Sequence, residues 1–122
     1  MSRRHEIKNY EVFNGTLTAD VESQITNVKN VDKVAYQINW NPADSLICDI
    51  EIYASNDHDI SVSPKWTLVN PNTGIRLDSS DVLGCHIINI QNFAFDYLKI
   101  NFNWVSGSGD VVASIAGHSI GA

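Results

Sequence analysis

Residues 34–54 have the sequence VAYQINWNPADSLICDIEIYA, and this stretch indicates the fold class. Apolar side chains occupy every second position on both sides of a short polar segment: Val34, Tyr36, Ile38 and Trp40, then Leu46, Cys48, Ile50, Ile52 and Ala54. A period of two is typical of a β-strand with one buried face. Residues 41–45, NPADS, are typical of a turn. We therefore predict an antiparallel hairpin.

The C-terminal region repeats this pattern. In DYLKINFNW, residues 96–104, the apolar positions are Leu98, Ile100, Phe102 and Trp104. The turn-forming segment SGSGD at 106–110 then leads to VVASIAG at 111–117, which we expect to be the final strand. We predict that residues 34–54 and 97–116 form two layers packed against each other.

Further short strands complete the expected architecture. Asn14-Gly15 lies between β-prone flanks and predicts a hairpin near the N-terminus. No segment has helical periodicity over three turns. About eight short strands indicate an all-β, antiparallel, two-layer β-sandwich with a jelly-roll-like topology. The core residues that we expect to pack across the layers are Ile38, Trp40, Ile50, Ile100, Phe102 and Trp104.

Length and charge set the domain organisation. The 122 residues fit one domain, 9–122, preceded by a basic segment, 1–8. That segment contains Arg3, Arg4 and Lys8 against Glu6, so the rest of the chain is more acidic than its net charge of −6. An acidic body argues against binding nucleic acid. The segment is either an arm that contacts an acidic neighbour or a solvated terminus.

The sequence also indicates the compartment. The N-terminus lacks the apolar region of a signal peptide, and no apolar run approaches the roughly 20 residues that cross a bilayer. We expect synthesis in a cytoplasm and no membrane partner. Cys48 and Cys85 both lie in strand-like runs, where free thiols suit a reducing compartment, and a disulfide is the alternative.

Catalytic patterns are missing from the sequence. No Gly-x-Ser-x-Gly motif, cysteine-pair zinc motif or phosphate-binding loop occurs. His86 lies inside an apolar run, and His118 lies near the end of the chain, so neither is paired with a nucleophile. We expect a protein that is not an enzyme and has no cofactor.

The loop after residue 54 is the one candidate ligand site. Asn56, Asp57 and Asp59 provide oxygen atoms of the kind that Ca²⁺ prefers, although loops also use these residues for turn geometry. Tyr53 and Trp66 could stack on a sugar ring, with Asn56 and Asp57 bonding its hydroxyls. We favour a plain loop after which Trp66 begins the next strand and packs inward.

Two segments resemble known proteins. Residues 54–69, with Ala54 to Asp57 followed by Trp66 and Val69, are similar to discoidin-like, galactose-binding jelly rolls, and FDYLKINF at 95–102 resembles the penultimate core strand of those domains. YLKI at 97–100, GSG at 107–109 and IAGHS at 115–119 are similar to the C-terminal hairpin of small bacteriophage virion proteins, and the resemblance covers roughly residues 30–120. This resemblance implies a jelly-roll fold and either a virion or a carbohydrate-binding role.

We therefore expect a non-enzymatic virion protein that decorates or cements a capsid, or is a tail accessory. Its partners would be the major capsid protein or other virion proteins, contacted through Arg3, Arg4 and Lys8, and other copies of itself in a homo-oligomer. The alternative is a carbohydrate-binding module that recognises a glycan through Tyr53, Asn56, Asp57 and Trp66.

Overall fold

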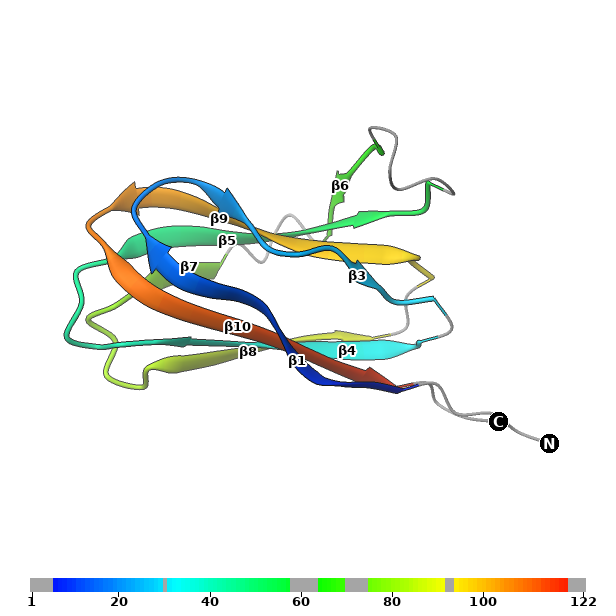
Figure 1. The fold of residues 1–122 in the computed structure, drawn as a ribbon, viewed down its shortest axis with the longest axis horizontal. Helices are drawn as coiled ribbons and strands as arrows, with labels where there is room; N and C mark the ends of the chain where they lie inside the picture. Colours follow the sequence, from blue (N-terminus) through cyan, green and yellow to red (C-terminus); the bar gives the residue numbers. More distant parts are fainter. Residues whose placement is uncertain (1–5, 30, 58–63, 70–74, 92–93, 119–122) are drawn as a thin grey trace.

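The computed structural model describes residues 6–29, 31–57, 64–69, 75–91 and 94–118 as two antiparallel β-sheets stacked face to face (Figure 1). Sheet A has the strand order β1 (Glu6–Leu17), β10 (Gly109–His118), β4 (Lys33–Trp40) and β8 (Cys85–Gln91). Sheet B has the order β2 (Val21–Glu22), β9 (Tyr97–Ser106), β5 (Ile47–Ser55) and β6 (Thr67–Leu68). In addition, β3 (Thr26–Asn27) pairs with β9, and β7 (Ile75–Asp78) pairs with β5.

This strand order is that of a jelly roll. Both β2 and β3 lie along β9, and both β6 and β7 lie along β5, so each pair acts as one interrupted strand. With each pair counted once, the chain passes between the two sheets as a double Greek key of about eight strands. The predicted all-β, antiparallel sandwich is therefore confirmed.

The predicted hairpin over 34–54 is wrong, because β4 belongs to sheet A and β5 to sheet B. The segment between them crosses from one layer to the other. The chain makes the same crossing between β9 and β10, so residues 97–116 also contribute one strand to each layer. The alternation of apolar residues shows which side of a strand is buried. It does not show whether the next strand pairs in the same sheet or lies in the opposite sheet, because the same side is buried in both cases.

The hairpin predicted at Asn14-Gly15 is also wrong. Strand β1 continues through both residues, which pair with Val112 and Val111 of β10. A type I′ turn needs positive φ at both central residues. Among the described glycines, positive φ occurs at Gly84 and Gly107 and not at Gly15.

The core lies between the sheets, as the alternating residues predict. Tyr36 and Ile38 from sheet A and Ile100 and Phe102 from sheet B are completely buried. Burial of each such side chain contributes about 1.5–3 kcal/mol. Two residues of the predicted core depart from it: Trp40 is only partly buried, and Trp104 is 40% exposed. The indole N–H of Trp104 donates to the Gly107 carbonyl.

None of the described residues forms a helix long and apolar enough to cross a membrane.

Candidate functional site

The loop that follows β5 uses its polar side chains to hold the backbone. The Asn56 amide donates to the Ala94 carbonyl over 3.3 Å and accepts from the Asp96 N–H over 2.7 Å. Asp57 accepts the Lys65 N–H and so joins the two ends of the loop. These contacts are those of a connecting loop, which was the interpretation favoured from the sequence.

The Ca²⁺ hypothesis stays a prediction. Asp59, its third residue, lies outside the described residues. Across the described ranges, no three His, Cys, Asp or Glu side chains form a group that could hold a metal ion.

Trp66 lies on the outer face of sheet B and does not pack into the core. The Lys99 Nζ is 4.4 Å from the centroid of the Trp66 ring, a cation–π contact. Lys99 is only 8% exposed, and its ammonium also forms a 3.1 Å ion pair with Glu22. The expectation that Trp66 packs inward is wrong because this tryptophan covers an outward-pointing lysine.

Tyr53 shares this outer face, since it lies directly opposite Lys99 in the pairing of β5 with β9. Partial burial and the neighbouring Glu51 raise the pKa of the Tyr53 hydroxyl. The structure thus brings Tyr53 and Trp66 together around Lys99. The side chains of Asn56 and Asp57 do not join this pair, because they form hydrogen bonds with backbone groups.

Charged and amide side chains cover the rest of the outer face of sheet B. Arg76 of β7 forms a 2.9 Å ion pair with Asp49 of β5, and this hydrogen bond lowers the pKa of the Asp49 carboxyl. Asn103 of β9 donates to Glu51. This face therefore consists of internally paired polar groups.

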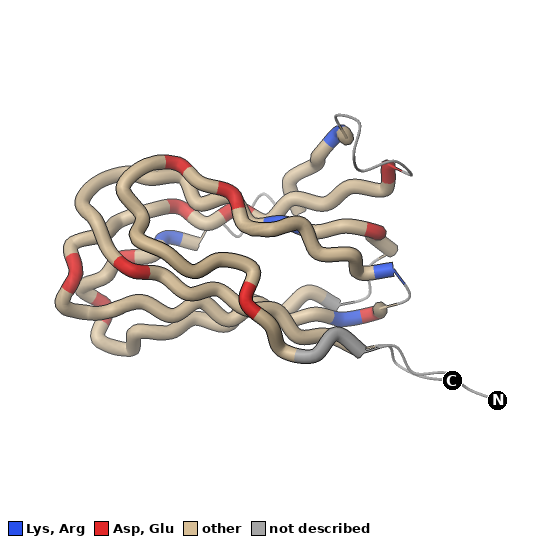
Figure 2. The backbone as a smooth tube through the Cα atoms, in the orientation of Figure 1, with Lys and Arg blue, Asp and Glu red and all other residues tan. Residues whose placement is uncertain are grey.

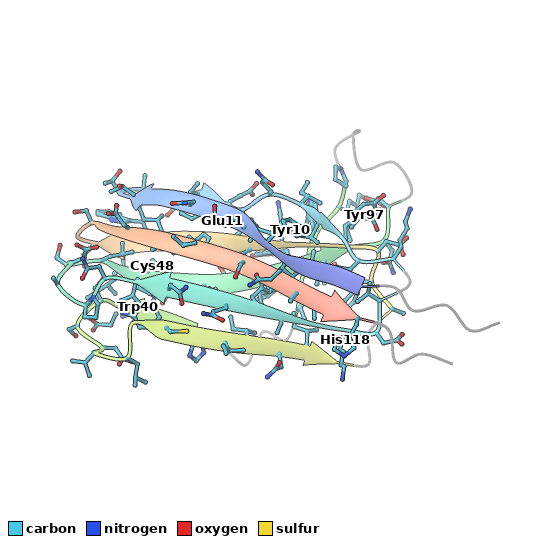
Figure 3. The ribbon with its side chains drawn as sticks, turned by 60° about the horizontal axis from the view of Figure 1, so that its bottom comes forward. Tyr10, Glu11, Trp40, Cys48, Tyr97 and His118 are labelled. Atoms are coloured by element: carbon cyan, nitrogen blue, oxygen red, sulfur yellow. The ribbon has the colours of Figure 1, made fainter. Side chains whose placement is uncertain are left out.

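The outer face of sheet A is different: it carries uncharged side chains, most of them short, across its centre. We define it as the A face by residues that lie in register across the sheet and point away from the core: Asn14, Val112, Asn39 and Cys85, then Ser114, Gln37 and Ile87, then Ala116, Ala35 and Asn89. Figure 3 shows sheet A from this side, with β1 along one border and β8 along the other. Glu11, opposite Ser114, is a charged residue at its β1 border.

Two pockets lie near these faces. One, of about 240 Å³, lies at the end of sheet A and is lined by Lys33, Val34, Ala35, Asn89, Ala116, Gly117 and His118. The other, of about 420 Å³, is lined by Ala54, Ser55, Asn56, Lys65, Thr67, Leu68, Val69 and Phe95. The second pocket adjoins the predicted glycan site and includes Asn56 from it.

At the end of the sandwich that carries the loops 18–20, 41–46, 79–84 and 107–108, these loops contain aspartates and no lysine or arginine (Figure 2). Each aspartate accepts a backbone N–H: Asp20 from Trp104, Asp44 from Asp110 and Asp81 from Leu83. Turn geometry thus accounts for these acidic residues. Beside Asp81, Val82 is 83% exposed and Leu83 is 77% exposed.

The remaining predicted residues are only partly described. Arg3 and Arg4 lie outside the described residues, whereas the backbone of Lys8 belongs to β1. Contact of this segment with a partner stays a prediction. Both cysteines are free: Cys48 is buried in sheet B, and Cys85 lies on the A face.

The A face was missed as a candidate site in the sequence. The signal was present in the small residues of residues 111–117, but small outward residues indicate a flat surface only when the neighbouring strands are known. The pairing of β10 with β1 and β4 supplies those neighbours.

Comparison with known proteins does not identify a family. No family model matches the sequence, and no curated protein matches it. Among solved structures, the crystal structure of the SPBc2 prophage-derived protein YomS is similar, with a TM-score of 0.42 and 14% identity over 98% of this chain and 96% of that chain. A likeness at this level carries no argument about function.

Proposed function

We propose that the chain is a non-enzymatic bacteriophage structural protein that decorates or cements a capsid, or serves as a tail accessory, through protein–protein contacts. The A face is the observation that carries the proposal. Its small uncharged side chains present a flat surface, and few charges would lose water when another protein covers it. The opposite face has its charges already paired with one another.

The physical basis of such a role is repetition. A decorating protein adds buried area at junctions between shell subunits, and a modest contact that is repeated by symmetry gains strength through avidity. No individual side chain is indispensable in this mechanism, but the flatness and neutrality of the contact face are. A basic segment at Arg3 and Arg4 would add contacts to an acidic neighbouring subunit.

The test introduces one arginine on either face. Ser114→Arg lies at the centre of the A face, and Asn27→Arg lies on β3 in sheet B as the matched control. Tagged variants would be expressed in host cells that are producing phage particles, and the particles would be separated on a density gradient. We expect the wild type and Asn27→Arg to co-sediment with particles and Ser114→Arg to stay at the top.

The outcome that overturns this proposal is a wild-type chain that never sediments with particles. A Ser114→Arg chain that sediments as the wild type does would exclude the A face as the contact. Deletion of residues 2–5 tests the basic segment separately, because this deletion ends before β1 begins at Glu6.

Carbohydrate binding is the second candidate, and one observation favours it. Tyr53 and Trp66 share the outer face of sheet B, and Asn56 of the same predicted site lines a pocket of about 420 Å³, although neither aromatic ring lines that pocket. It ranks second because Asn56 and Asp57 already bond the backbone. This candidate predicts glycan-array binding that Trp66→Ala abolishes.

A further inference from the structure

Strand β8 is the edge of sheet A that the fold leaves unprotected. It pairs with β4 along one side over the whole of Cys85–Gln91, and no described strand pairs with its other side. Its sequence, CHIINIQ, has no proline and no Asp, Glu, Lys or Arg. The residues that usually prevent edge-to-edge pairing are therefore missing from this strand.

The other described edges are all interrupted. At the far border of sheet A, β1 has register shifts between Ile7 and Tyr10 and between Glu11 and Phe13. In sheet B, the edge strands β2, β3 and β6 have two residues each, and β7 has four. Among the described strands, β8 alone combines an edge position, seven residues and an unbroken register.

The pairing of β8 with β4 determines which backbone groups of β8 point to the free edge. The Trp40 N–H donates to the Gly84 carbonyl over 2.9 Å, just before β8 begins. In an antiparallel pair, residues alternate between those bonded to the partner and those pointing away. This alternation leaves the N–H and C=O groups of Cys85, Ile87, Asn89 and Gln91 directed at the free edge.

We propose that β8 pairs antiparallel with β8 of a second copy, so that two A sheets join into one continuous sheet. A strand edge is recognised by another strand edge, because only a strand presents N–H and C=O groups at the matching spacing. Two identical antiparallel strands are related by a two-fold axis, which closes the assembly as a dimer.

Charge favours a second copy as the occupant. The chain has a net charge of −6, so most surfaces of two copies repel each other. Strand β8 brings no Asp, Glu, Lys or Arg side chain to its own image. The exposed side chain of Ile87, 54% exposed, gains a neighbour across the new interface.

In one register, all the backbone N–H and C=O groups at the free edge find partners. In this register the two-fold axis of the dimer passes through Ile88. Cys85 then lies opposite Gln91 of the second copy, and Ile87 lies opposite Asn89. The two Ile88 residues face each other as a non-hydrogen-bonded pair, with Cα atoms about 4.5 Å apart. This spacing lies within the range that a disulfide spans.

Sedimentation velocity of the purified chain, from about 1 µM to about 500 µM, tests the proposal. We expect a dimer that Ile87→Lys weakens by about tenfold or more, because lysine on an edge strand opposes pairing. Val105→Lys is the matched control, since Val105 is 42% exposed and lies at the end of β9. It should dimerise as the wild type does.

A covalent readout fixes the register. Ile88→Cys in a Cys85→Ser background should give a disulfide-linked dimer on mild oxidation, whereas Cys85→Ser alone should not. A wild-type chain that is monomeric at every concentration overturns the proposal. So does a dimer that Ile87→Lys leaves unchanged, because that result places the contact elsewhere.

This inference goes beyond the proposed function and does not depend on it. The experiment uses the purified chain without particles. A chain that dimerises through β8 but never enters particles would refute only the virion role. A monomer that co-sediments with particles would refute only the edge pairing.

Discussion

At the scale of single residues, Gly107 lets two crossings of the chain approach each other. It has φ of +71°, and a Cβ there would lie 2.0 Å from the Ser45 carbonyl oxygen. Ser45 belongs to the crossing from β4 to β5, and Gly107 belongs to the crossing from β9 to β10. The two crossings also share a 3.2 Å hydrogen bond from the Ser45 N–H to the Ser108 carbonyl.

Gly107→Ala should therefore lower the free energy of unfolding by more than the 1–2 kcal/mol or so that a left-handed backbone costs alone. Gly15→Ala is the control, because its nearest neighbour would be Phe13 at 3.6 Å and its φ is not positive. It should change stability by at most about 0.5 kcal/mol. Urea denaturation followed by tryptophan fluorescence measures both. Equal losses from the two substitutions would contradict this account.

These two glycines show what the sequence could and could not predict. Asn14-Gly15 is a strong local hairpin signal, yet β1 extends through it because pairing with β10 satisfies its backbone. SGSGD was correctly predicted as a turn. Local preferences describe how a chain can bend, whereas a long-range partner decides whether it does.

At the scale of elements, the end of β5 is joined to the start of β9 by one side chain. Asn56 bonds Ala94 and Asp96, which precede β9, and so fixes the loop beside the core residue Leu98. The sequence correctly placed Asn56 in a plain connecting loop, with ligand binding by its amide as the alternative, but it could not show what the amide bonds. Only the position of residues 94–96, which lie far away in the chain, shows where the amide is used.

Asn56→Ala removes both hydrogen bonds and should lower the free energy of unfolding by about 1–3 kcal/mol. Asn27→Ala is the control, because Asn27 is exposed and bonds only the nearby Lys29 N–H among the described residues. Its effect should be smaller than that of Asn56→Ala. Thermal unfolding followed by circular dichroism gives both values. No loss from Asn56→Ala would return the amide to the glycan hypothesis.

Strand pairing explains which architectural predictions succeeded. The alternating residues of β4, β5 and β9 correctly gave the buried faces of these strands, because burial follows from the period of two. Their distribution between the sheets was wrong, because every strand pair in this jelly roll except those of β5 with β6 and β7 joins segments distant in sequence. Trp104 shows the same limit: its spacing fits the core, but its strand continues past the core.

At the scale of the whole molecule, each sheet contributes one weakly acidic group to the interior. Tyr36 of sheet A is completely buried, and neither its hydroxyl nor that of Thr26 reaches a hydrogen-bond partner among the described residues. Burial raises the pKa of Tyr36, and the neighbouring Tyr10 adds to the effect. Burial and Asp49 raise the pKa of Cys48 in sheet B to about 11.

The molecule should consequently lose stability in alkali. Above pH 9 the unfolded chain releases the Cys48 proton, and above pH 10 it releases that of Tyr36, while the folded chain keeps both. Since the unfolded state then binds fewer protons, the free energy of unfolding falls as pH rises, by about 1.4 kcal/mol per unit for each group. For Cys48 this loss runs from pH 9 to about 11.

Urea denaturation at pH 7, 9, 10 and 10.5 measures the effect against Tyr36→Phe. At pH 7 this variant should stay within about 1 kcal/mol of the wild type, because the deleted hydroxyl has no hydrogen bond to lose. Above pH 10 it should lose stability more slowly than the wild type, because Tyr36 no longer contributes a proton to the difference between the two states. Cys48→Ala should lower the free energy of unfolding by the same amount at every pH below 9, because it leaves a small cavity. Above pH 9 its free energy of unfolding should fall less steeply than that of the wild type. If the free energy of unfolding fell with pH in parallel for all three chains, burial would not be retaining either proton. That result would contradict the close packing of the two sheets around Tyr36 and Cys48.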